Sequence, residues 1–229
     1  TNSTPYLNAT ITDSGSGVQS CQYSLDNGTT WNSANYNPSK NECYITLPSQ
    51  PDGKILNITF RGIDNVNNIG PKAIDVQRTV DAQAPTIGEV IITPTIERKG
   101  INWTNSSFFL NASVTDSGSG INASTCEICN STSPGCNSWT PGTYSNGYCY
   151  KTIGPFNNGE IIYVNVRIKD NLSNLGTGKE VQRTVDAEGP SAQDVMVKPS
   201  YNEYTNSTPY LNATITDSGS GVQSCQYSL

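Results

Sequence analysis

Residues 6–17 read YLNATITDSGSG, and this stretch decides the fold class. Its first half alternates, because Leu7, Ala9 and Ile11 are separated by polar residues. A period of two is typical of a β-strand with one buried face, since successive side chains point to opposite faces of a sheet. The second half is rich in the residues that form turns. The stretch therefore predicts a half-buried strand that ends in a tight polar loop.

The same stretch recurs along the chain, which is 229 residues long. Residues 109–120 read FLNASVTDSGSG, and residues 205–229 repeat residues 1–25 without a change. Two more landmarks are duplicated: VQRTVDA at 76–82 and 181–187, and RGIDNVNNIG at 61–70, matched by RIKDNLSNLG at 167–176. They indicate a unit of about 102 residues in two diverged versions, within a super-repeat of 204.

The duplicated TVDA segments, followed by Pro85 and Pro190, read as linkers because proline cannot continue a strand ladder. Domain boundaries drawn at these linkers divide the chain into three parts. Residues 82–186 form one complete domain. Residues 1–81 form a domain that lacks its first strand, and the counterpart of that strand lies near residues 191–204. Residues 187–229 start the next copy of the first domain.

Alternation extends to the other strands. Leu56, Ile58 and Phe60 alternate with polar residues, and residues 162–168 do the same, while no segment carries a helical stripe. Several short strands in about 102 residues, with Gly, Pro and Asn turns between them, predict an all-β fold of tandem two-sheet antiparallel β-sandwiches, arranged like beads on a string.

The chain has seven cysteines and no histidine, which excludes Cys–His and Ser–His catalysis. Corresponding positions in the two repeats predict the disulfides Cys21–Cys43 and Cys126–Cys149, and Cys129–Cys136 then closes a small loop of the second repeat. Cys225 copies Cys21, and we expect its partner beyond residue 229; a free reactive thiol is the alternative. Cys126 and Cys129 also form a CxxC motif, but no helix-forming segment follows to lower a thiol pKa. Disulfides indicate an oxidising, extracellular setting.

The order TDSGSGV, YSLDNGTTW, FRGIDNVNNIG and VQRTVDAQAPT resembles the Ig-like repeat domains found in tandem in bacterial and archaeal cell-surface proteins, adhesins and extracellular filaments. The D-N-x-x-N strand end and the TVD-x-x-AP linker carry most of the resemblance, which covers essentially the whole chain. It departs from antibody domains, whose paired cysteines bridge two sheets around a buried tryptophan. The resemblance implies a stalk, filament or adhesin module and names no ligand.

Residues 24–31, SLDNGTTW, match the pattern S-x-D-x-G-x-x-W and are similar to the Asp-box of sialidases. In that family the motif stabilises a hairpin in each propeller blade. Here it occurs once, and the second repeat keeps only Trp139 of its four landmarks. We therefore expect a folded hairpin tip and no sialidase.

Aspartates recur at strand ends and linkers: Asp13, Asp64, Asp81, Asp116, Asp170 and Asp186. Turn formation by an aspartate that binds its own backbone explains them most simply. A structural Ca²⁺ at the domain junctions is the alternative, because loop oxygens suit that ion, although the dense spacing of an EF-hand is absent. We expect no other metal and no other cofactor apart from covalent glycans.

Glycosylation sequons are the strongest motif. Asn8, Asn57 and Asn111 fall on the polar phase of their strands, where a bulky glycan can remain in solvent. Strand faces that are simply rich in Asn and Thr are the alternative. The twelve acceptors are Asn2, Asn8, Asn27, Asn57, Asn102, Asn105, Asn111, Asn122, Asn130, Asn171, Asn206 and Asn212.

The formal net charge is −6, and the 13 basic residues are scattered singly, so we expect neither a nucleic-acid partner nor binding to an anionic membrane. No stretch approaches the roughly 18 apolar residues of a membrane span. We expect a non-enzymatic structural glycoprotein that forms an extracellular filament, fibre or surface stalk, with copies of the same repeat as partners. In one variant, separate chains lend a strand to a neighbour's incomplete sheet.

The alternative function is that of an adhesin, or a carbohydrate-binding accessory module of a secreted protein. Loops expected at residues 32–42 and 130–148 would then present Trp31, Tyr36, Trp139 and Tyr144 to sugars. Unchanged 204-residue repetition favours the fibre, because selection for binding would diversify the copies.

Overall fold

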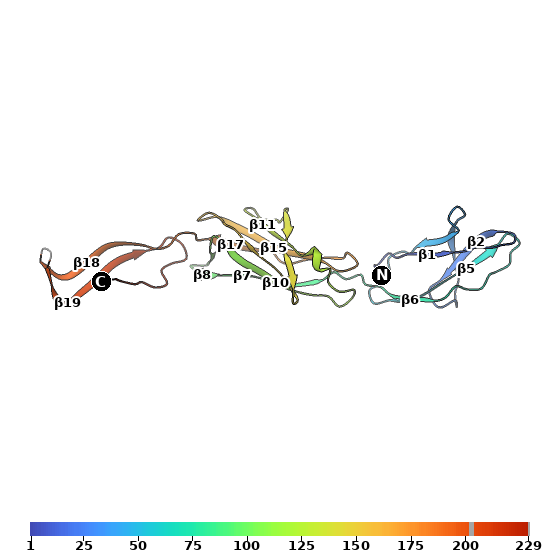
Figure 1. Cartoon of the computed structure of the whole chain (residues 1–229), viewed down its shortest axis with the longest axis horizontal. Coiled ribbons are helices and arrows are strands. Elements are labelled where there is room, and N and C mark those ends of the chain that lie inside the picture. Colours follow the sequence, from blue (N-terminus) through green and yellow to red (C-terminus); the bar gives the residue numbers. More distant parts are fainter. Residues whose placement is uncertain (202–203, 229) are drawn as a thin grey trace. The chain divides into compact units, whose positions relative to one another are not determined.

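The computed structural model describes residues 1–201 and 204–228. These residues are mostly strands, with one 3-10 turn at Ala123–Thr125 (Figure 1). Among them no helix is long and apolar enough to cross a bilayer. The strands form several largely antiparallel sheets, so the predicted all-β fold class is confirmed.

The first repeat has six strands in the order β1-β4-β3-β2-β5-β6. Ala34 of β3 still pairs with β2, whereas Asn35 already pairs with β4. This strand therefore passes from one layer of the sandwich to the other, a common way to build a sandwich corner. The strands are β1 (Tyr6–Thr10), β2 (Val18–Ser24), β3 (Asn32–Asn37), β4 (Glu42–Thr46), β5 (Ile55–Asp64) and β6 (Val76–Thr79).

The core of the first repeat comes from the alternating residues. Leu7 of β1 and Leu56, Ile58 and Phe60 of β5 are buried. Cys21 and Cys43 lie in the same cluster, so their disulfide is packed inside the sandwich.

The second repeat has two sheets, with strand orders β13-β14-β10-β7 and β12-β11-β15-β17-β9-β8, and β16 pairs with β15. One pair, β17 with β9, is parallel. The strands are β7 (Thr86–Thr93), β8 (Ile96–Arg98), β9 (Ile101–Thr104), β10 (Phe108–Thr115), β11 (Glu127–Ser131), β12 (Trp139–Pro141), β13 (Thr143–Ser145), β14 (Tyr148–Ile153), β15 (Ile161–Lys169), β16 (Leu175–Thr177) and β17 (Val181–Val185).

After the second linker the chain forms a two-stranded ribbon, β18 (Ser191–Tyr201) with β19 (Tyr204–Thr216). β19 is the copy of β1 displaced by 204 residues. The ribbon covers little of its own apolar surface, and Val195 and Tyr210 are exposed.

The chain divides into two compact units. The first contains Thr1–Pro85 together with the loops Asp116–Ile121 and Lys169–Leu175, and the second contains the rest. The two loops belong by sequence to the second repeat, since they follow β10 and β15. The compact units and the sequence repeats therefore assign these two loops differently.

Candidate metal centre at the repeat junction

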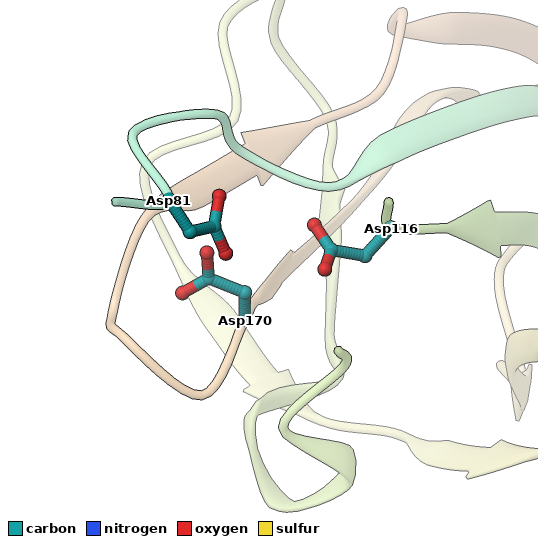
Figure 2. Close-up of side chains that lie close together, drawn as sticks. All are labelled: Asp81, Asp116 and Asp170. Carbon is teal, nitrogen blue, oxygen red and sulfur yellow. The ribbon is translucent and has the colours of Figure 1, made fainter. Parts of the chain in front are cut away.

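Three carboxylates meet in the first compact unit. Asp81 follows β6, Asp116 follows β10 and Asp170 follows β15. One oxygen from each lies within 4.8 Å of the others, and Figure 2 shows the three side chains pointing toward a common space. The structure thus brings together three of the six aspartates that the sequence marks, and it places Asp13, Asp64 and Asp186 outside this cluster.

Asp116 and Asp170 are held by the turns that they start. Asp116 Oδ2 accepts hydrogen bonds from the backbone N–H groups of Gly118 (3.1 Å) and Gly120 (2.7 Å). Asp170 Oδ1 accepts from the backbone N–H groups of Leu172 and Asn174, each at 2.8 Å. The turn-forming role expected from the sequence is therefore present, and it fixes the direction of both carboxylates.

Asp81 joins the linker to both loops. Its Oδ2 accepts a 2.6 Å hydrogen bond from the backbone N–H of Ser119, and the Asn174 side chain donates to its carbonyl oxygen at 3.2 Å. Burial by itself raises the pKa of this carboxyl. The hydrogen bonds from Ser119 and Gln83 outweigh burial, so the pKa of Asp81 lies below its ordinary value.

These residues fit an oxygen-coordinated cation such as Ca²⁺. Asp81 is 6% exposed and Asp170 is fully buried, and burying a charged carboxylate is costly unless it is compensated. The hydroxyl oxygen of Ser119 is also buried. Carboxylate and hydroxyl oxygens without nitrogen or sulfur donors favour Ca²⁺ over zinc or copper, and further oxygens would complete the six to eight that Ca²⁺ takes.

The second linker repeats the same contacts. Asp186 Oδ2 accepts a 2.7 Å hydrogen bond from the backbone N–H of Ser220. Asp217 Oδ1 accepts from Gly219 (2.9 Å) and Gly221 (2.7 Å), as Asp116 does from its own loop. Asp217 and the two serines were not predicted as site residues, although the third DSGSG was the signal that could have found them.

Arg98 also contacts the loop at the second linker. Arg98 Nη1 lies 3.8 Å from Asp217 Oδ1 and donates a 3.0 Å hydrogen bond to the carbonyl oxygen of Gly219. Burial again raises the pKa of Asp186, and the Ser220 hydrogen bonds lower it below its ordinary value.

Glycine is required where the loop meets the linker. A Cβ atom added to Gly118 would collide with the Asp81 carboxylate, and one added to Gly219 would collide with Asp186. The first glycine of DSGSG thus lets the loop backbone approach the linker carboxylate. We call the hydrogen bond from Ser119 to Asp81, with its copy from Ser220 to Asp186, the linker latch.

The SLDNGTTW segment is a hairpin turn between the paired strands β2 and β3. Ser24 Oγ donates to Asp26 Oδ1 (2.6 Å) and accepts from the backbone N–H of Gly28 (2.8 Å), and Thr30 donates twice to Asp26. Hydrogen bonds from Ser24 and Thr30 lower the pKa of Asp26 to about 2. The motif performs the hairpin role expected from the sequence.

Trp31, which follows this turn, and Trp139 of the second repeat are each stacked against an arginine. The Arg61 guanidinium lies 4.1 Å from the ring centroid of Trp31, and that of Arg167 lies 4.4 Å from the ring of Trp139. Each ring therefore has one face covered by a cation.

The segments expected to be loops are partly strands. Residues 32–37 form β3, and residues 130–148 contain β12 and β13. The expectation that these segments are open loops is wrong at those residues, because β3 pairs with β4 and β13 pairs with β14.

Three disulfides are present: Cys21–Cys43, Cys126–Cys149 and Cys129–Cys136. Cys225 is exposed and unpaired. Cys21–Cys43 and Cys126–Cys149 occupy corresponding positions in the two repeats, whereas Cys129–Cys136 belongs to the second repeat.

Each of the twelve sequon asparagines is exposed or half-buried. Two already use the side-chain nitrogen that a glycan would occupy. Asn8 Nδ2 donates to Glu42 at 2.7 Å, and Asn171 Nδ2 donates to the carbonyl oxygen of Ser119 at 2.8 Å. The Asn171 contact lies in the junction loop.

No family model matches the sequence, and no curated protein matches it. Among solved structures the chain is similar to the crystal structure of the FN1–FN3 domains of chicken CNTN1, with 11% identity and a TM-score of 0.32. The match covers 82% of this chain and 64% of that one.

Proposed function

We propose that the chain is a segment of an extracellular fibre, filament or surface stalk built from tandem β-sandwich repeats. The repeats would act as spacers and need no active site, so we infer no enzymatic activity. The buried disulfides support an oxidising, extracellular location.

One observation carries the proposal: the linker latch is built twice. Asp81 and Ser119 form it at 2.6 Å, and Asp186 and Ser220 form it at 2.7 Å, each beside a glycine that admits no side chain. A latch copied from linker to linker restrains successive repeats in the same way. That is what a fibre of stacked repeats requires, since each repeat contacts mainly its neighbours.

The proposal includes covalent N-glycans and copies of the same repeat as partners. Asn8, Asn57 and Asn111 lie on β1, β5 and β10, between residues that point into the core. Glycans on these positions would sheathe the outer face of the sandwich and leave its core unchanged.

We also propose that Ca²⁺ occupies the cluster of Asp81, Asp116 and Asp170. The ion would offset the charge of two buried carboxylates and would hold the linker against the loops after β10 and β15. It would stiffen the junction, which a stalk requires.

The size of the native chain tests the fibre. After deglycosylation and reduction, we expect a species far larger than the 24.6 kDa of this chain. A discrete band at that mass would contradict a continuous repeating chain. Mass mapping of the glycopeptides tests the sheath: unmodified Asn8, Asn57 and Asn111 would contradict it.

Calcium binding is tested by calorimetry with CaCl₂ on the full chain. We expect a saturable site that is lost in Asp170→Asn and kept in Asp13→Asn, whose aspartate lies in the equivalent turn outside the cluster. A titration without heat, or equal binding by the two variants, would contradict the proposed calcium site. The hydrogen bonds of the linker latch do not depend on that outcome.

The adhesin or carbohydrate-binding module remains the alternative function. It is favoured by the concentration of Trp, Tyr and Asn near the hairpin tips, although Arg61 and Arg167 already cover one face of Trp31 and Trp139. A saturable hit on a glycan array would support it and would displace the purely structural role.

A further inference from the structure

The outer face of the second repeat carries an aromatic pair beside a sequon. Phe109 of β10 and Tyr150 of β14 have ring centroids 5.7 Å apart, and Phe109 is 39% exposed. Asn111 lies two residues after Phe109 on the same strand, and directly opposite Tyr150 in the register of β10 with β14. Because Leu110 and Ala112 are buried, alternation directs Asn111 and its two aromatic neighbours to the outer face. We call Phe109 with Tyr150 the second-repeat platform.

The first repeat has the same arrangement. Tyr6 of β1 and Tyr44 of β4 have ring centroids 6.0 Å apart, and Tyr6 is 53% exposed. Asn8 follows Tyr6 by two residues and lies directly opposite Tyr44. We call Tyr6 with Tyr44 the first-repeat platform. A single exposed aromatic residue needs no explanation, but the same pair in the same register of two diverged repeats indicates a shared role.

A sugar linked to either asparagine leaves the sheet between aromatic side chains. Directly opposite residues of an antiparallel pair have Cβ atoms about 4.5–5.5 Å apart, and residues two apart on one strand are separated by roughly 7 Å. The C–H groups on one face of a pyranose are apolar and slightly positive, and the face of an aromatic ring is apolar and slightly negative. The two surfaces are therefore complementary and close together.

We propose that the first sugar of an N-glycan on Asn111 stacks on the second-repeat platform, and that of a glycan on Asn8 on the first-repeat platform. The inference rests on the glycans of the proposed function. It goes further by naming the sequons at which the protein holds its glycan and the residues that hold it. Stacking covers apolar ring surface and restricts the direction in which the glycan leaves the sheet.

The hydrogen bond between Asn8 and Glu42 is compatible with this contact. The side-chain nitrogen of an asparagine carries two hydrogens, and an N-linked sugar replaces only one of them. Glu42 Oε1 accepts from Asn8 Nδ2 at 2.7 Å and from the Tyr6 hydroxyl at 3.1 Å. The carboxylate therefore holds the asparagine beside the ring that the sugar covers.

Asn57 is a strand sequon without a platform. It lies on β5, directly opposite Gln77 of β6, and Gln77 Nε2 donates a 2.9 Å hydrogen bond to Asn57 Oδ1. The residue two positions earlier is Ile55. Neither the preceding nor the facing position is aromatic, so a glycan on Asn57 provides an internal control.

NMR of the full chain, carrying a defined sugar, tests the stacking directly. The chain is secreted from a host that modifies N-x-S/T sequons and is trimmed enzymatically to one N-acetylglucosamine per site, which is the probe. We expect upfield shifts for the C–H protons of the sugar on Asn111, because the ring current shields protons above an aromatic face. The shifts should shrink in Phe109→Leu, which keeps an apolar side chain, and vanish when Tyr150→Leu is added. The sugar on Asn57 should keep ordinary shifts in all of these proteins.

A double-mutant cycle measures what the contact contributes to stability. Ser113→Ala removes the sequon and leaves Asn111 and both rings of the platform unchanged. We expect Phe109→Ala to lower the folding equilibrium constant of the second repeat about three- to tenfold more with the sugar than in the Ser113→Ala background. Asn57→Gln is the control background, because it removes a sugar from a different strand and should leave the effect of Phe109→Ala unchanged. Hydrogen exchange over residues 86–185 in urea measures all of these proteins.

The possible failures are distinguishable. Ordinary shifts for the sugar on Asn111, with equal losses from Phe109→Ala in the presence and absence of that sugar, would overturn the platform and leave the glycan sheath standing. The rings would then act only as a cross-strand pair. Unmodified Asn8 and Asn111 beside a modified Asn57 in the native glycopeptide map would overturn it as well. Neither result affects the fibre, since that proposal depends on the size of the native chain.

Discussion

A comparison of β1 with β10 shows how one additional neighbouring strand changes the burial of the same sequence pattern. Leu110 of β10 is fully buried between β14 and β7, and Ala112 and Val114 beside it are buried too. The equivalent Leu7 is 8% exposed, and Ala9 and Ile11 are only half-buried. Alternation puts these residues on the inner face in both repeats, but only a neighbouring strand completes their burial. The second repeat should therefore be the more stable one.

The largest effect is expected from a charge on the covering strand. Val90→Asp places an unpaired carboxylate in the core of the second repeat and should cost more than about 4 kcal/mol, enough to unfold it. Val195→Asp, at the aligned position on β18, should leave the chain's stability unchanged because that side chain is exposed. Hydrogen exchange read separately over residues 86–185 and 1–81 measures both. Protection of residues 86–185 that survives in Val90→Asp would contradict the role of β7.

Removal of the equivalent disulfides sharpens the difference. Each pair closes a loop of similar length, with sequence separations of 22 and 23, and contributes about 3 kcal/mol in the chain-entropy model. Cys21→Ser with Cys43→Ser should unfold the first repeat, whose β1 pairs with β4 alone among the described strands. Cys126→Ser with Cys149→Ser should only lower the urea midpoint of the second, which keeps β7 and Cys129–Cys136. Equal behaviour of the two double variants would contradict a difference in stability between the two repeats.

A smaller loss is expected at the linker latch. Gly118→Ala presses a methyl group against the Asp81 carboxylate and should destabilise the first compact unit by about 1–3 kcal/mol. Gly189→Ala is the control, because an added Cβ there meets no atom within 4 Å, and it should change stability by less than about 0.5 kcal/mol. Thermal unfolding measures both, and an unchanged melting temperature in Gly118→Ala would show that the loop can move away from the linker.

The smallest predicted effect is a difference between the two repeats in how their stability depends on pH. The folded-state pKa of Asp26 is about 2, below its ordinary value, so its contribution is complete above that ordinary value and is lost as the pH falls from about 4 to about 2. The second repeat lacks this turn. The first repeat alone should therefore lose stability through Asp26 in this range, and Asp26→Asn should remove that part of the pH dependence. Thermal melts at several pH values measure it, with an NMR titration of the Asp26 carboxyl as the check.

Much of the fold could be predicted because the alternation is local. Leu7, Leu56 and Leu110 each point inward on a period of two, and that period follows from strand geometry alone. Residues 32–37 were expected to be a loop and form β3, since a short polar strand has no apolar phase to reveal it. It is held by pairing with β2 and β4.

The candidate site was predictable only in part. Asp116 and Asp170 could be assigned to turns from the residues that follow them. Their meeting with Asp81 could not be predicted, because the three lie at the ends of β6, β10 and β15, which are distant in sequence. The spacing of residues along the chain does not show which distant strand ends meet. The sequence therefore lacks the dense ligand pattern that is typical of a calcium-binding loop.

The sequence by itself determined the period of the strands, the repeat of 204 residues, the correspondence of the cysteines and the polar phase of the sequons. Each of these features follows from comparing positions within the sequence. Only the tertiary structure decided which edges are covered and which charges are buried, because burial depends on what packs against a residue from elsewhere in the chain. Leu7 and Leu110 occupy equivalent positions in nearly the same string of letters, and a strand supplied from elsewhere in the chain makes the difference between them.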